Sequence, residues 1–525
     1  AWSADVLQGI AQVVAGAESR GPVNMLWFAM SAILLWRLCE ELELGSAVRW
    51  LAVALFASAA EVAYTLVSMQ TEGPTTTVVF GLALLIQRNE KPDAWGLTAM
   101  AALFGLLVGL KVSNLWFALP LGLWLLWQWR FRLPWRALPA ALFAAFVVAG
   151  SSYVYACVLT GNPVLPAFNG VFHSPFFAPV NYYDSRWHSG FGWDIVWNLV
   201  FHASAYIQGG TAAGAFFLVG LSGCFLLAFR RPHARGLALV AGVAFLLPLS
   251  IIQYWRYATP GMALLVPAML CGVPGHVKSG IHARVRTAVL WLLPVASLLF
   301  VSSVCWQFRD GMLPLWLRKG DSAVVERFAP ARLIAQVIQR RHGETARTLM
   351  LVRGKPFVAE LAGKGFADSW YDPRLHALLK RPAAATDPAK WMQAIQLTGA
   401  NLLVTERVAI PAGMQSAIAA NHGTLEYAVN DLALWQLHAG SPGIATSMGG
   451  RGTLVRFATS GAPSGPTLVH GELELACNPQ PVQRAPVVIV WRGVAANGRH
   501  FGRAEWMQCQ PDGHAHAVFD KAVVG

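Results

Sequence analysis

The chain has 525 residues, of which 55% are hydrophobic and only 13% are charged, and its formal net charge is +13. Ordinary soluble domains carry about 25% charged residues, so this composition excludes a simple cytoplasmic enzyme, a disordered protein and a disulfide-rich secreted protein. Charge is also uneven, at 9% of residues 1–306 and 18% of residues 307–525. The sequence therefore predicts a membrane domain over residues 1–306, followed by a water-soluble part.

Ten apolar segments in the first part are expected to be membrane-spanning helices, because a helix needs about 20 apolar residues to cross a bilayer. The third and ninth are short, and Pro260 and Pro267 interrupt the ninth. The predicted spans are residues 23–38, 48–68, 75–88, 95–111, 113–129, 136–158, 211–229, 234–253, 258–272 and 285–306.

Basic residues fix the expected orientation of these spans. One alternating set of short connections holds 13 lysines and arginines, whereas the other set holds only Arg20, Lys111, Arg186 and Arg256. Cytoplasmic loops are enriched in lysine and arginine, so the second set and everything after residue 306 should face the periplasm. Ten spans would place both ends outside, and we therefore expect a first helix to be absent from this chain. Orientation accounts for much of the positive charge, and we expect no nucleic-acid partner.

The long outer connection, residues 159–210, contains a segment suited to the membrane surface. Residues 191–208 mix aromatic side chains with Asp194, Asn198 and His202, which favours a helix lying in the interface with its apolar face toward lipid. Tryptophans near span ends are typical of membrane anchors, although stacking on a sugar is an alternative interpretation.

The soluble part is expected to form two domains. Residues 307–440 predict an α/β domain, and residues 451–525 predict a β-rich domain after a Gly/Ser/Pro-rich linker. In the β-rich domain Cys477 and Cys509 could pair in an oxidising compartment or stay free. Expected helices are 322–341 and 388–397, and expected strands are 348–352, 401–405, 424–429, 432–437, 453–457, 467–475 and 487–491.

Acidic residues on the outer face are the first candidates for chemistry, because charge near membrane depth is costly. Zinc-protease, Walker and dinucleotide-binding motifs are absent from the sequence. Each of the four acids also has a structural explanation. Asp5 can be a solvated loop residue, Glu61 can pair inside the bundle, Glu72 can favour a helix N-terminus, and Asp184 can pair with Arg186.

Cations on the same face give these acids a possible partner. Lysine and arginine bind phosphoryl oxygens through charge-assisted hydrogen bonds, and a carboxylate can take the proton of an acceptor hydroxyl. Lys111, Arg186 and Arg256 could therefore hold the phosphate of a lipid-linked sugar beside an acidic base. Glycosyl transfer from a lipid-phosphate sugar requires this combination.

Five short stretches, in order and sidedness, resemble the GT-C superfamily of integral-membrane glycosyltransferases, in particular its bacterial ArnT/PMT-like (glycosyltransferase 39-type) members. They read WSADVL, QTE, GLKVS, GNPVLP and RYxxP, at residues 2–7, 70–72, 109–113, 161–166 and 256–260. The likeness covers roughly residues 1–306 and, more loosely, the α/β domain. It implies that Asp5 is the catalytic base or a metal-associated acid and that Glu72 is the second-loop acid. The paired acid of the superfamily pattern is absent beside Asp5, so the base and any divalent metal stay open.

The expected fold is therefore a polytopic α-helical, GT-C-like membrane protein with a C-terminal periplasmic α/β module and a small β unit. The expected activity is inverting transfer of a sugar, at the periplasmic face of a bacterial inner membrane, from a polyprenyl-phosphate donor to a hydroxyl of a lipid, glycan or protein. Asp5 would act as general base with help from Glu72. The expected phosphate ligands are Lys111, Arg186 and Arg256, and the expected substrate contacts are Asp184, Tyr257, His202 and Asn162.

Two other functions fit the same sequence. A polysaccharide polymerase or ligase would use a polyprenyl-diphosphate donor instead. A transporter or assembly scaffold would perform no covalent transfer, but transporters often have matching halves, and no halves match here.

Overall fold

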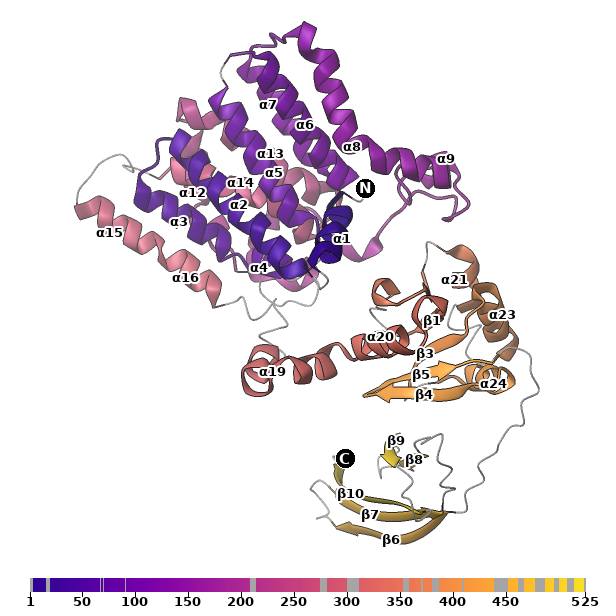
Figure 1. The fold of residues 1–525 in the computed structure, drawn as a ribbon. Coiled ribbons are helices and arrows are strands. Elements are labelled where there is room, and N and C mark those ends of the chain that lie inside the picture. Colours follow the sequence, from indigo (N-terminus) through magenta and orange to yellow (C-terminus); the bar gives the residue numbers. More distant parts are fainter. Residues whose placement is uncertain are drawn as a thin grey trace. The chain divides into compact units, whose positions relative to one another are not determined.

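The computed structural model divides into two compact units, Ala1–Asp321 and Ser322–Gly525 (Figure 1). The predicted linker 440–450, Cys477 and Cys509 lie outside the described residues. The described residues are 3–15, 19–66, 68, 70–89, 91–207, 214–273, 281–299, 311–352, 358–369, 372–379, 387–407, 410–438, 452–460, 467–476, 487–494, 500–507 and 514–523.

The first unit is a bundle of helices around one large apolar core. Every predicted apolar segment contains helix within its described residues. A short helix, α1 (Ser3–Ala15), precedes them. The bundle helices are α2 (Arg20–Glu41), α3 (Ser46–Ala57), α4 (Ala60–Leu66), α5 (Glu72–Arg88), α6 (Ala94–Leu110), α7 (Leu115–Gln128), α8 (Leu138–Thr160), α11 (Phe217–Gly220), α12 (Ser222–Ala228), α13 (Pro232–Ile251), α14 (Trp255–Cys271), α15 (Ile281–Leu290) and α16 (Leu292–Leu298).

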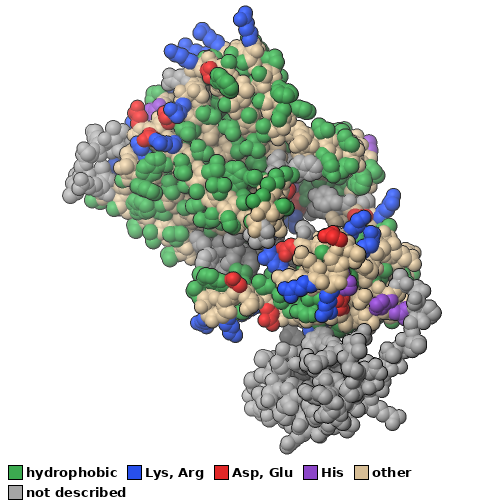
Figure 2. Space-filling model, in the orientation of Figure 1, with side chains coloured by type: hydrophobic (Ala, Val, Ile, Leu, Met, Phe, Trp, Pro, Cys, Tyr) green, Lys and Arg blue, Asp and Glu red, His purple; other side chains and the backbone are tan. Residues whose placement is uncertain are grey.

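Three described helical stretches are long and apolar enough to cross a membrane: Arg20–Glu41, Trp135–Thr160 and Pro232–Ile251. Helices α3 and α4 meet at 68° and would make a fourth if they form one broken span. Figure 2 shows a largely hydrophobic surface over the visible face of this unit, with lysine and arginine at its upper end. The remaining predicted spans are shorter or interrupted helices, so the total of ten crossings stays a prediction.

Basic residues gather at the end of the bundle where α2 and α5 finish. Arg37 and Arg49 lie 2.6 and 2.7 Å from the Glu40 carboxylate, and Arg88 lies 3.3 Å from Glu41. Helix α5 runs from Glu72 to Arg88, so Glu72 lies at the opposite end of that helix. The candidate outer residue Glu72 and the basic loops are therefore separated along α5.

Glycine permits the close approach of α13 and α14. A Cβ atom at Gly261 would collide with the backbone carbonyl of Ala244. We expect Gly261→Ala to destabilise the unit by about 1–3 kcal/mol, as overpacking does elsewhere. The matched control is Gly122→Ala in α7, where an added Cβ atom would meet no neighbouring group within 4 Å. This change should be neutral or slightly stabilising. Thermal unfolding in detergent measures both, and equal midpoints would contradict the close packing.

The second unit contains a five-stranded mixed sheet in the order β2-β1-β3-β5-β4. Strands β1, β2 and β3 run parallel, whereas β5 pairs antiparallel with β3 and β4. The strands are β1 (Arg347–Leu351), β2 (Lys364–Ala367), β3 (Leu402–Glu406), β4 (Thr424–Val429) and β5 (Leu432–Gln436).

Alternate strand residues face two separate cores, as the period of two of a β-strand requires. Leu349 and Leu403 pack in the core that includes α23 and α24, whereas Met350 and Leu402 pack in the core that includes α20. Helices therefore cover both faces of the sheet. The helices are α19 (Met312–Phe328), in which the division between the units falls, α20 (Pro330–Arg341), α21 (Pro373–Leu379), α23 (Pro388–Thr398) and α24 (Ala412–Ala420).

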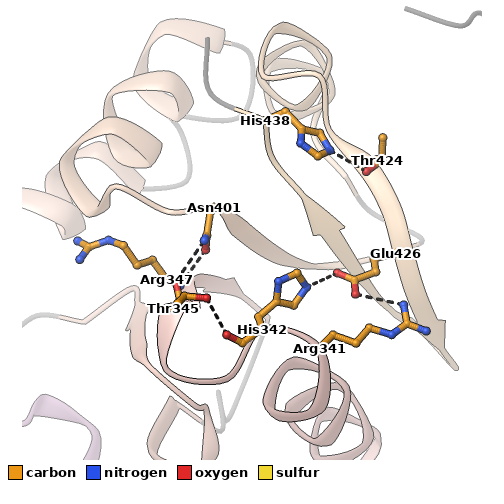
Figure 3. A network of polar contacts seen from close by, with 8 residues as sticks. All are labelled: Arg341, His342, Thr345, Arg347, Asn401, Thr424, Glu426 and His438. Atoms are coloured by element: carbon orange, nitrogen blue, oxygen red, sulfur yellow. Dashed lines mark hydrogen bonds and ion pairs between the residues drawn. The ribbon is translucent and has the colours of Figure 1, made fainter. Parts of the chain in front are cut away.

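Polar contacts fasten the end of α20 to this sheet (Figure 3). His342 Nε2 lies 2.7 Å from Glu426 Oε2, and Arg341 Nη1 lies 3.1 Å from Glu426 Oε1. Asn401 joins two neighbouring segments, because it accepts the Arg347 backbone N–H and donates to the Thr345 carbonyl. These bonds explain how the end of α20 and strand β1 are held against the neighbouring strands. No ligand is needed for this arrangement.

Beyond the sheet, five strands form antiparallel pairings. Three make one sheet in the order β10-β7-β6, and β8 pairs with β9. These strands are β6 (Gly452–Ser460), β7 (Thr467–Ala476), β8 (Val487–Val494), β9 (His500–Met507) and β10 (His514–Val523).

Candidate functional site

Three helix ends bring opposite charges together at Glu72. Glu72 is the first residue of α5 and is 4% exposed. Its Oε1 atom lies 3.6 Å from Lys111 Nζ, at the end of α6, and 3.3 Å from Arg256 Nε, in the first turn of α14. An acid at a helix N-terminus and a base at a helix C-terminus are both favoured by the helix dipole. Arg256 lies at an N-terminus, and the Glu72 carboxylate offsets that unfavourable position.

Aromatic rings hold both cations from the side. Lys111 Nζ lies 3.6 Å from the centroid of the Tyr257 ring, and the Arg256 guanidinium lies 4.9 and 5.2 Å from the rings of Tyr254 and Tyr257. Trp116 packs against Tyr257 with ring centroids 5.9 Å apart. Cation–π attraction strengthens when the groups lose water, so these rings restrict both cations to the neighbourhood of Glu72.

The second carboxylate oxygen of Glu72 has no hydrogen bond from the described part of the chain. Glu72 Oε2 is fully buried, and Glu72 lines two pockets, one with Lys111 and Tyr257 and the other with Thr65 and Thr259. A buried acceptor without a donor costs about 1–3 kcal/mol, and more when it is charged. This oxygen is therefore suited to receive a hydrogen bond from a ligand.

Glu61 belongs to the same group, although no feature of the sequence favours it over the other acids. It lies in α4, is 2% exposed, and interacts electrostatically with Arg256 and Glu72. Tyr64 and Tyr254 share these interactions. The one available signal was an acid inside a predicted span.

Asp5 makes no described contact with the group of charged residues around Glu72. It is an exposed residue in the first turn of α1. Partial loss of hydration raises the pKa of its carboxyl group above the usual value, which suits a proton acceptor. Within the described residues, no hydrogen bond or ion pair joins Asp5 to Glu72, Lys111 or Arg256.

The predicted third phosphate ligand, Arg186, is bound to another acid. Its Nε and Nη2 atoms donate to the two carboxylate oxygens of Asp184 over 2.8 and 2.7 Å, and this fork holds the pKa of Asp184 below its usual range. The next residue, Trp187, stacks on Tyr254 with centroids 4.0 Å apart. The pair thus lies on a loop that packs on the aromatic side of the site, without a described contact to Glu72.

Two predicted substrate contacts have other surroundings. Asn162 is fully buried, donates to the Ala167 carbonyl and to Asn169 Oδ1, and accepts the Val164 N–H. Its side chain therefore shapes the outer loop and presents no surface to a substrate. His202 is exposed at the end of a short helix, α10 (Ile195–Phe201).

The predicted interface helix over residues 191–208 is shorter than expected. Helix α10 begins after Asp194 and ends at Phe201, and a single 3-10 turn, Ala203–Ala205, follows. Asp194 and His202, both with non-helical backbone angles, border it on either side. Trp193, 98% exposed, lies just before the helix.

Protein metal sites usually combine several ligand side chains. The described residues contain no group of three or more His, Cys, Asp or Glu side chains that could hold a metal ion. Glu72 already has two cations beside one of its oxygens, and a third positive charge would be repelled there.

No family model and no curated protein matches the chain. Solved structures similar to it include the crystal structure of ArnT from Cupriavidus metallidurans bound to undecaprenyl phosphate, at 14% identity and a TM-score of 0.49, with 81% of this chain and 85% of that chain covered. The cryo-EM structure of the arabinofuranosyltransferase AftD from Mycobacteria matches at 13% identity and a TM-score of 0.47, over 82% of this chain and 36% of that chain. Likeness at this level of identity and TM-score transfers no substrate or site residue to this chain.

Proposed function

We propose that the chain is a membrane glycosyltransferase that moves a sugar from a polyprenyl-phosphate donor to a hydroxyl group of a lipid, glycan or protein. The observation that carries the proposal is Glu72, a buried carboxylate that lines two pockets, with two cations beside one oxygen and a second oxygen that receives no hydrogen bond from the described residues. Such a site offers charge stabilisation to a phosphate and a hydrogen-bond acceptor to a hydroxyl.

In the proposed reaction, the acceptor oxygen attacks the anomeric carbon while the bond from that carbon to the phosphate oxygen breaks. Polyprenyl phosphate leaves with the bonding electron pair, and the configuration at the carbon inverts. Lys111 and Arg256 stabilise the charge that develops on the phosphate. Asp5 takes the acceptor proton, and Glu72 holds the two cations in place.

The proposed sidedness follows from the loops. The basic connections lie at the far end of α5 from Glu72, and lysine and arginine mark the cytoplasmic side. We therefore place the site at the periplasmic face of a bacterial inner membrane. The domain division into 1–306, 307–440 and 451–525 is part of the proposal, with the soluble domains docking the acceptor.

The donor class is testable with the purified chain in lipid or detergent. We expect release of polyprenyl phosphate, coupled one to one with glycosylated acceptor, from a monophosphate-linked sugar. A preference for diphosphate-linked oligosaccharide would instead favour a polymerase or ligase. Movement of substrate across vesicles without covalent transfer would favour a transporter.

Arg256 and Arg186 can be distinguished by their effect on donor KM. We expect Arg256→Met to raise donor KM by about 10- to 100-fold, because a hydrogen bond to a charged group is worth about 1.5–3 kcal/mol. Arg186→Met should change it by less than about threefold, because the Arg186 side chain is bound to Asp184 and has no described contact with Glu72. Equal losses in the two variants would place both arginines on the donor.

A further inference from the structure

Asn24 lies at a junction of three segments of the bundle. It is in the first turns of α2, is 6% exposed, and lines the pocket on the α4 side of Glu72. Its side-chain Nδ2 is 3.2, 3.1 and 2.8 Å from the carbonyl oxygens of Thr65, Leu66 and Ser68, to which it donates. Its Oδ1 accepts the Gln8 side-chain N–H over 3.3 Å.

The bond to Gln8 ties α1 to the bundle. Gln8 is a buried polar residue of α1 and lies three positions after Asp5, so both residues share one side of that helix. A second contact closes the junction, since the Ser19 hydroxyl donates to the Gln8 carbonyl over 3.3 Å. The placement of Asp5 therefore depends on polar contacts made one turn further along α1.

The bonds to the carbonyls cap α4. The last carbonyls of a helix have no partner within it, and α4 has only seven residues after its 68° break from α3. Asn24 supplies donors to this end. Helix α4 carries Glu61 and leads directly to the segment before Glu72, so its end sets the start of α5.

We propose that Asn24 is a positioning residue. Its side-chain amide holds α1 and the end of α4 in a fixed arrangement and thereby fixes the position of Asp5 relative to Glu72. The structural part is independent of the activity. The catalytic part rests on the proposed function.

Hydrogen–deuterium exchange of the full chain in detergent tests the structural part. Asn24→Asp keeps the size of the side chain and the Oδ1 acceptor but removes both amide N–H donors. We expect exchange to become at least about tenfold faster in residues 60–66, because two or more bonds of about 1 kcal/mol are lost there, but not in residues 3–15, because the bond from Gln8 to Oδ1 is kept. Gln8→Leu should accelerate exchange in residues 3–15 only.

The matched control is Ser31→Ala. Ser31 is also buried on α2, and its hydroxyl bonds Thr77 over 2.8 Å, so the variant loses a buried bond of the same helix without touching α1 or α4. We expect unchanged exchange in both segments. If Asn24→Asp left residues 60–66 as in the wild type, or Gln8→Leu left residues 3–15 as in the wild type, the shared arrangement would be disproved. Should Asn24→Asp not fold, unchanged exchange of residues 3–15 in Gln8→Leu would overturn the link to α1, and faster exchange there would support it.

Kinetics test the catalytic part. We expect Asn24→Asp to lower kcat about 100-fold, as a misplacement of about 1 Å can, with donor KM within threefold and binding of unglycosylated polyprenyl phosphate unchanged. Asn24→Gln, which restores the amide, should recover part of the rate. Wild-type kcat in an Asn24→Asp protein with altered exchange would remove the catalytic role. Absence of transfer and of polyprenyl-phosphate binding in the wild type would instead reject the proposed function. Hydrogen–deuterium exchange would still test whether Asn24 holds α1 and the end of α4 together.

Discussion

The Asp5→Asn variant should transfer sugar about 10²- to 10⁴-fold more slowly than the wild type, which is the usual contribution of a general base. An amide of the same shape cannot take the acceptor proton. The pKa of Asp5 is raised because nearby protein removes part of its water, so the wild-type rate should rise with pH as this carboxyl group ionises. Initial rates at saturating donor, measured across pH for both proteins, check the size and the pH dependence.

Asp5→Glu provides the matched control because it keeps a carboxylate at the same helix position. We expect it to retain more activity than Asp5→Asn, with less than full rate because the longer side chain moves the oxygen atoms. Wild-type rates in Asp5→Asn would transfer the role of base to Glu72 or Glu61, the two buried acids that face Arg256.

The helical positions of the bundle could be predicted because apolar segments of sufficient length leave few alternatives. Helix α5 was expected over residues 75–88 and spans Glu72–Arg88, and α13 was expected over 234–253 and spans Pro232–Ile251. The break between α3 and α4 was not predicted, since residues 48–68 were interpreted as one span and hydrophobicity alone does not locate a bend within it.

The candidate site was predictable only in part, for the same reason. Glu72, Lys111 and Arg256 were grouped from sidedness alone, and the structure brings them together. Sidedness carries no information about distance within a face, so Arg186 was grouped with them although it binds Asp184, two residues away. Asn162 was chosen from a motif, but a buried amide can equally satisfy its own loop, as its bonds to Ala167 and Asn169 do.

The Glu72→Gln variant should lose transfer by about 10²- to 10³-fold, which is the scale found when one preorganised electrostatic group is removed. The glutamine has no charge to hold Lys111 and Arg256, so both cations can move from the positions that suit a phosphate. We also expect a loss of about 1–3 kcal/mol in stability. Breaking a fully buried pair costs about 3–5 kcal/mol, and the loss is smaller here because the Lys111 and Arg256 side chains are 27% and 21% exposed.

Glu41→Gln is the matched control for this effect. It removes an ion pair with Arg88 at the other end of the bundle, where the two side chains are 37% and 64% exposed, and such pairs contribute about 0–1 kcal/mol. Activity and unfolding midpoint should stay near wild-type values.

A second comparison separates the effect of charge from the effect of packing. If unpaired cations cause the instability of Glu72→Gln, adding Arg256→Gln should restore part of the lost stability while transfer stays low. Further destabilisation in the double variant would show that Arg256 stabilises the bundle through its aromatic contacts even when Glu72 carries no charge.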